Sequence, residues 1–338
     1  MLFLNVLLFL LGLVLVIKGG DWFVDGAVGI AHRFHIPEII VGATVVSIGT
    51  TLPEVMVSAT AAIGGQGGIA YGNAIGSIIC NTALIAAITV TLRPGKVDRK
   101  ALVMPVLFFF GAAVVYCLNA YLTGYFSREI GFLLLGIFLV YMVITVRQGF
   151  KNPVEFSAEE VTEIGDEAVE EADKAHTSSL VRDLLLLVVG AVLIAVGATL
   201  LKDNATVIAQ TMGVPESVIG LTIVALGTSL PELVTAITSL VKGHGSLSLG
   251  NVIGANLFNL VLVSGVSTVL APFAVPQTAS LFGQNASLVM EIPVMLAVMA
   301  LLTLPTLLRG KLARFQGIAL LAIYAAFLVV QFVLVVPV

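Results

Sequence analysis

Two glutamates, Glu54 and Glu232, lie deep inside long apolar stretches of the sequence. A charge placed in the hydrocarbon core of a membrane costs several kcal/mol unless something compensates it. A bound cation would compensate it, and the alternative is a structural carboxylate that is protonated or hydrogen-bonded. Because the glutamate occurs twice in closely similar surroundings, the pattern favours a cation-binding site.

The residues around both glutamates carry the oxygen atoms that hard cations prefer as ligands. Thr50 lies four residues before Glu54, and Thr228 four residues before Glu232, so each pair shares one face of a helix. Hydroxyls beside them and a second four-spaced pair on the next span add further oxygens, at Thr51, Ser229, Ser77 with Asn81, and Asn259. The amides would bring oxygen without charge.

Backbone carbonyls are candidate ligands as well. Pro53 and Pro231 lack the N–H that would bond the carbonyl four residues back, at Gly49 and Gly227. Free carbonyls at membrane depth are tolerated where they line a cavity or bind an ion. Two more carbonyls that could contribute lie just upstream, at Ser47 and Ala225.

The two sets of residues belong to an internal repeat with an offset of 178 residues. PEIIVGATVVSIGTTLPE, residues 37–54, aligns without gaps to PESVIGLTIVALGTSLPE, residues 215–232, and GNAIGSIICN, residues 72–81, aligns to GNVIGANLFN, residues 250–259. Ser77 thereby corresponds to Ala255, where the hydroxyl is missing. We expect the glycines of GNAIG and GNVIG to allow close helix packing, with Asn73 and Asn251 bracing helices instead of binding ions.

The composition places these motifs in a membrane protein. Hydrophobic residues make up 59% of the chain and charged residues only 11%. A helix needs about 20 mostly apolar residues to cross the hydrocarbon core. Ten stretches qualify, near 2–27, 39–64, 71–92, 101–120, 129–147, 181–203, 216–241, 247–270, 286–307 and 315–336. The first is expected to be a retained span, because it lacks a basic leader and a cleavage site.

One long polar segment divides the spans five and five. We predict a five-helix unit over 1–147, an acidic linker over 148–180 and a second five-helix unit over 181–338. Because each unit has an odd number of spans, the second enters the membrane from the opposite side. The sequence therefore predicts an all-α integral membrane protein of ten transmembrane helices arranged as two inverted repeats, as in many secondary transporters.

Lysine and arginine concentrate in cytoplasmic connections of membrane proteins, which predicts the orientation. With both termini external, the linker is cytoplasmic, and only Arg128 and Lys202 among the sixteen basic residues fall in external segments. The expected location is the cell membrane.

In GTTLPE with GNAIGSIICN, and again in GTSLPE with GNVIGANLFN, the sequence resembles the calcium/cation antiporter superfamily, particularly the prokaryotic sodium/calcium exchangers. The resemblance implies a four-site diamond built by broken helices, through which sodium and calcium bind alternately. Glu54 and Glu232 would be shared carboxylates, with Thr50 and Thr228 holding calcium. The remaining implied roles are the central site for Asn81 and Asn259, and the flanking sodium sites for Ser47, Ala225, Thr51, Ser77 and Ser229.

Two positions depart from that pattern. Ala255 removes a hydroxyl that many relatives place at an outer sodium site, which affects the number of sodium ions. Asn259 stands where some relatives, including potassium-dependent exchangers, carry an aspartate, which argues against potassium co-transport.

The leading hypothesis is sodium/calcium antiport, in which the two ions compete for Glu54 and Glu232. The nearest alternative is calcium/proton antiport at the same glutamates, followed by a cation channel, which has less need of an inverted repeat. An intramembrane enzyme is disfavoured because no nucleophile–base pair accompanies the glutamates. The expected partners are calcium, sodium and the lipid bilayer, with no cofactor, no nucleic acid and a monomer as the working unit.

Overall fold

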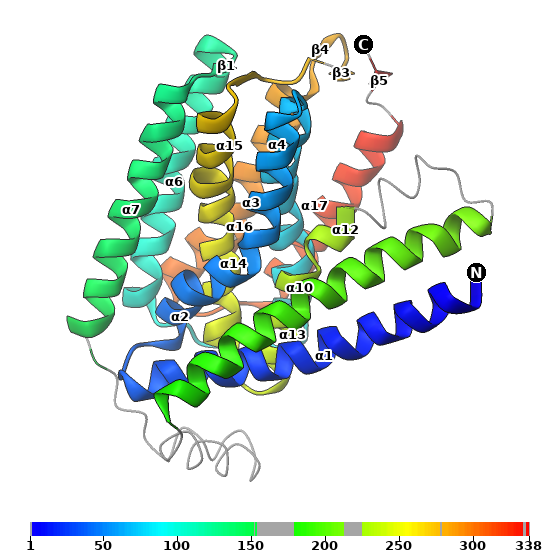
Figure 1. Cartoon of the computed structure of the whole chain (residues 1–338). Helices are drawn as coiled ribbons and strands as arrows, with labels where there is room; N and C mark the ends of the chain where they lie inside the picture. The colour runs from blue at the N-terminus through cyan, green and yellow to red at the C-terminus, as the bar shows by residue number, and fades with distance from the viewer. Residues whose placement is uncertain are drawn as a thin grey trace.

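The computed structural model describes residues 2–151, 153, 179–212, 225–277, 279–333 and 336–337. Within these ranges, nine helices are long and apolar enough to cross a membrane. They extend over Leu2–Arg33, Glu38–Ile63, Gly67–Leu92, Arg99–Thr123, Arg128–Lys151, Leu180–Thr211, Gly245–Leu270, Ser287–Arg309 and Arg314–Val333. Figure 1 shows most of them as an upright bundle.

Some of these spans contain short π-helical segments. The first half of the chain contains α1 (Leu2–Arg33), α2 (Glu38–Val41), η1 (Gly42–Val46), α3 (Ser47–Ile63), α4 (Gly67–Cys80), η2 (Asn81–Ala86), α5 (Ala87–Leu92), α6 (Arg99–Thr123), β1 (Tyr125–Phe126) and α7 (Arg128–Lys151). The second half contains α10 (Leu180–Thr211), α12 (Ala225–Thr228), α13 (Leu230–Val241), α14 (Gly245–Phe258), η4 (Asn259–Val263), α15 (Ser264–Leu270), β2 (Phe273–Ala274), β3 (Ala279–Leu281), β4 (Gln284–Asn285), η5 (Ser287–Glu291), α16 (Ile292–Arg309), α17 (Arg314–Val333) and β5 (Val336–Pro337).

Nine of the ten predicted spans coincide with these helices. The seventh, predicted over 216–241, lies partly outside the described residues, and its described part consists of α12 and α13. Most of the acidic linker also lies outside the described residues. Among the described residues, five short strands lie in connections between helices and near the C-terminal end. Strand β1 pairs with β2, and β3 pairs with both β4 and β5.

The two longest helices, α1 and α10, lie side by side and lean away from the bundle (Figure 1). Glycines spaced by seven residues let their backbones approach, with Gly12 facing Gly197 and Gly19 facing Gly190. A Cβ atom at Gly19 would lie 2.9 Å from the carbonyl oxygen of Gly190. Small residues at such contacts are the usual means of close helix packing in lipid.

Polar contacts join these two helices to each other and to the rest of the bundle near the C-terminal end of α1. The Nε of Arg33 donates to the Asp183 carboxylate of α10 at 3.2 Å, and Lys242 forms an ion pair with Asp25. The pair formed by α1 and α10 is therefore fixed to the bundle at that end.

Candidate ion-binding site

Helix α3 has its polar side chains inside the protein and its apolar side chains outside. Leu52 and Met56 are exposed, by 51% and 66% respectively, as expected for side chains that face lipid. The buried polar stripe on the opposite face consists of Ser47, Thr50, Thr51, Glu54 and Ser58. The predicted pairing of Thr50 with Glu54 on one helix face is confirmed.

Helix α13 has the same arrangement in the second half. Glu232 is fully buried in its first turn, while Ile237 and Val241 are exposed. Two buried hydroxyls, Thr235 and Ser239, continue the polar face three and seven residues after the glutamate. Each glutamate thus sits on a polar stripe of a helix whose outer face is apolar.

The fold brings the two glutamates together. Helices α3 and α13 are in contact. The carboxylates of Glu54 and Glu232 lie near each other, and the Thr50 side chain lies near that of Glu232. Within the described residues, no donor forms a hydrogen bond of normal geometry with either carboxylate. Two buried carboxylates without donors are a suitable set of ligands for a hard cation.

Asn81 and Asn259 each begin a π-helical segment, at η2 and η4, and both are fully buried. The Asn259 amide nitrogen donates to the Ala255 carbonyl at 3.0 Å, which leaves its oxygen directed elsewhere. The oxygens of both amides lack a partner among the described residues. Segments of π-helix are rare and occur often at functional sites. Because one begins at each of these two equivalent asparagines, the repeat is visible in the backbone as well as in the sequence.

The two proline motifs differ in backbone. In the second half, α12 ends at Thr228, and α13 begins at Leu230 with Pro231 in its first turn. In the first half, α3 runs through Pro53 without interruption, directly after the π-helical segment η1. The resemblance implies a broken helix in both motifs, and this expectation is wrong for the first, since Pro53 lies inside the continuous helix α3.

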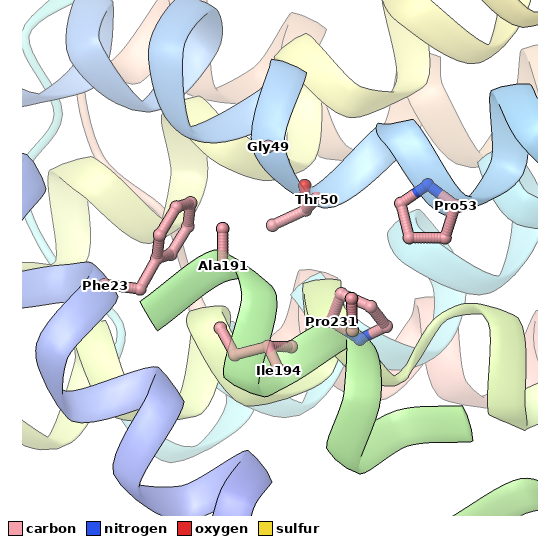
Figure 2. A pocket seen from close by; sticks show the side chains of 8 residues that line it. Phe23, Gly49, Thr50, Pro53, Ala191, Ile194 and Pro231 are labelled. Atoms are coloured by element: carbon pink, nitrogen blue, oxygen red, sulfur yellow. The ribbon is translucent and has the colours of Figure 1, made fainter. Parts of the chain in front are cut away.

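A small cavity of about 10 Å³ separates the two proline motifs from α1 and α10. Figure 2 shows Thr50 and Pro53 on one side and Pro231 opposite, with Phe23 closing one end. The remaining lining residues are Gly49, Ala191, Ile194 and Ala195. Such a volume has room for about one water molecule, so side chains fill nearly all the space between the motifs and these two helices.

The other predicted ligands are placed as follows. Ser77 is buried on α4, one turn before Asn81, and Ser229 is buried between α12 and α13. Thr228 is half-buried at the end of α12. Ala225 begins α12, and its side chain lies outside what the structure describes.

Sequence reasoning missed the hydroxyls of Thr235 and Ser239. Neither has a partner among the described residues. Their spacing of three and seven residues from Glu232 would have indicated the same helix face. The expectation that Asn251 braces helices named no partner, and the structure places it in contact with Ser47 and Thr50 of the other half.

Comparison with known proteins identifies the family. The sequence profile described as sodium/calcium exchanger protein matches residues 4–147 and 183–333. The chain belongs to the sodium/calcium exchanger family. Both matched segments contain one copy of the glutamate motif.

Several relatives match almost the whole chain. An uncharacterized membrane protein of Methanocaldococcus jannaschii is 37% identical, covering 96% of this chain and 97% of its own. A sodium/calcium exchanger of Methanosarcina acetivorans is 32% identical over 97% of this chain and 98% of its own. The solved structure of the sodium-calcium exchanger NCX_Mj soaked with Na+ and Sr2+ superposes with a TM-score of 0.79 at 33% identity, covering 98% of this chain and 100% of that one. This exchanger family member is therefore an integral membrane protein of a transporter family.

Proposed function

We propose that this chain is a secondary active antiporter that exchanges sodium for calcium across the membrane by alternating access. The observation that carries the proposal is the pair of buried carboxylates, Glu54 and Glu232, which come from equivalent positions of the repeat and lack hydrogen-bond donors among the described residues. Burying two charged carboxylates without hydrogen-bond donors is costly unless cations bind them. The name of the solved exchanger supports sodium and calcium as the ions.

In the proposed mechanism, calcium and sodium compete for the same two carboxylates. One divalent ion or two monovalent ions would neutralise both charges, so the ion-filled site can change the side to which it opens. An empty site would keep two uncompensated charges and resist that change. The proposed ligands are Glu54, Glu232, Thr50, Thr228, Asn81, Asn259, Ser77, Thr51, Ser229 and the carbonyls of Ser47 and Ala225.

The proposed architecture is a monomer of two inverted five-helix repeats joined by the acidic linker. The two matched segments of the family profile and the π-helices at Asn81 and Asn259 support the repeat. We place both termini outside and the linker in the cytoplasm, because lysine and arginine concentrate on that side.

The direct test is calcium uptake into vesicles that contain the purified protein, with sodium, potassium and proton gradients imposed one at a time. An outward sodium gradient at equal pH on both sides is expected to drive calcium uptake, and a potassium gradient is not. Uptake driven by a proton gradient without sodium would support calcium/proton antiport instead. Calcium flux that is independent of any counter-ion would indicate a channel.

The missing hydroxyl at Ala255 provides a second test. Replacing Ala255 by serine is expected to lower the sodium concentration for half-maximal calcium uptake by roughly fivefold, because one added oxygen contact contributes about 1 kcal/mol. The calcium KM should change little. The measurement is the sodium dependence of uptake, and Ser77→Ala, at the equivalent position, is expected to shift it in the opposite direction. Equal sodium dependence of all three proteins would remove these positions from the sodium sites.

A further inference from the structure

We propose that Asn251 is a positioning residue for the ion site, which holds the Thr50 hydroxyl so that its oxygen lone pairs are available to a cation. This inference rests on the proposed function, since it assigns a task within that site. Asn251 belongs to α14 in the second half and Thr50 to α3 in the first, so the contact links the two repeats.

The contacts of Asn251 define its task. Its side-chain oxygen Oδ1 accepts from Thr50 Oγ1 at 3.2 Å and lies 3.3 Å from Ser47 Oγ. Its backbone carbonyl lies 3.0 Å from the same serine hydroxyl. The Asn251 side chain is fully buried. The Ser47 hydroxyl has a closer acceptor in its own half, the Gly42 carbonyl at 2.7 Å, so the hydroxyl whose orientation depends on Asn251 is that of Thr50.

The orientation matters because a hydroxyl has one proton and binds a cation through its lone pairs. The Thr50 hydroxyl lies near the Glu232 carboxylate. Without another acceptor, its proton would point at that carboxylate and occupy a position that a cation needs. The other acceptor described for the Thr50 hydroxyl is the Ser47 carbonyl. That contact measures 3.5 Å and is longer than the 3.2 Å between Thr50 Oγ1 and Asn251 Oδ1.

The glycines that flank Asn251 explain how it reaches the other half. A Cβ atom at Gly254 would lie 2.6 Å from the Cα of Ala43, and one at Gly250 would lie 2.9 Å from the Cα of Ile39. Helix α14 therefore packs directly on the backbone of α2 and η1. In the motif GNVIG, the glycines allow α14 to approach α2 and η1, and the asparagine between them can then reach the hydroxyl of Thr50.

The equivalent residue of the first half, Asn73, makes a different set of contacts. Its amide nitrogen donates to the Ser58 hydroxyl at 2.8 Å and to the Glu54 carbonyl at 3.3 Å. Asn73 thus bonds within its own half and does so as a donor. It provides a matched control for the role of Asn251.

A double-mutant cycle on the apparent KM for calcium tests the proposal in vesicles that contain the full chain. Asn251→Ala is expected to raise the KM roughly three- to tenfold, which corresponds to one hydrogen bond, with a smaller change in the limiting rate. The same substitution should have almost no further effect in a Thr50→Val background, where the hydroxyl is already absent. It should keep its full effect in a Thr50→Ser background, which restores the hydroxyl.

The control cycle combines Asn73→Ala with Thr50→Val, and its two effects are expected to multiply independently. Independent effects of Asn251→Ala and Thr50→Val would overturn the proposal, because Asn251 would not act through Thr50. If Asn251→Ala yields no folded protein, Asn251→Ser replaces it in the same cycle, and failure of both to fold would assign Asn251 to packing and also overturn the proposal. Absence of sodium-driven uptake by the unaltered protein would overturn the proposed function instead.

Discussion

Glu54→Gln is expected to lower sodium-driven calcium uptake by roughly a hundredfold or more, because removal of one partner from a buried charge site costs about 3–5 kcal/mol. Glutamine keeps the shape of the side chain and one oxygen, so the effect reports the lost charge. Glu232→Gln should have a similar effect, since the two carboxylates act on the same ions.

Uptake is measured in sealed vesicles, and the thermal unfolding of each variant is measured with and without calcium. A ligand that binds only the folded protein raises its Tm, so calcium should stabilise the unaltered chain and not the Glu54→Gln variant. The matched control is Glu129→Gln, at an exposed glutamate in the first turn of α7. Full sodium-driven uptake by either site variant would refute the assignment of that carboxylate.

Gly254→Leu is expected to disturb the packing of the two halves and to destabilise the folded protein by about 3 kcal/mol, the upper end of the usual cost of overpacking a core. A Cβ atom at this position would lie 2.6 Å from the Cα of Ala43 and 2.7 Å from its carbonyl oxygen. Both neighbours are backbone atoms and cannot rotate away. The protein should be lost from the monodisperse fraction in detergent, with a lowered Tm for whatever remains.

The control for this substitution is Gly111→Leu on α6. Gly111 is exposed, and a Cβ atom there meets no described atom within 4 Å. This variant should fold normally, since leucine also has the higher helix propensity. A Gly254→Leu protein with unchanged Tm and normal uptake would show that the contact between α14 and η1 is not needed.

The sequence predicts most of the helices because a membrane span must satisfy its backbone hydrogen bonds within the helix and face lipid with apolar side chains. The same rule makes Glu54 and Glu232 conspicuous, since a charge inside such a span requires a reason. The repeat then places Asn81 and Asn259 at matching positions. The helices and the two glutamates follow from the constraints of a lipid environment, and the asparagines follow from the constant offset of the repeat.

The π-helices at η2 and η4 could not be predicted in this way. Neither NTALIA nor NLVLV contains a proline or glycine that would mark an irregular turn. Helix packing decides the local hydrogen-bond pattern there. The uninterrupted α3 at Pro53, in contrast with the break before Pro231, has the same origin, because nearly identical sequences adopt different backbones in different surroundings.

The contact between Asn251 and Thr50 was also beyond sequence reasoning. The expectation that Asn251 braces helices gave no partner, since the partner lies 201 residues away in the chain. Only the approach of α14 to η1 brings the two side chains together.

The buried polar stripe of α3 has a consequence for the biosynthesis of the protein. The span that contains α3 is the least apolar of the nine described candidate spans, and Asn251, which contacts its Ser47, is 204 residues further along the chain. At about 5–20 residues per second, a ribosome needs roughly 10–40 s to make that distance. During this time the Thr50 hydroxyl of the nascent first half lies in the membrane without the Asn251 acceptor that it contacts in the complete fold.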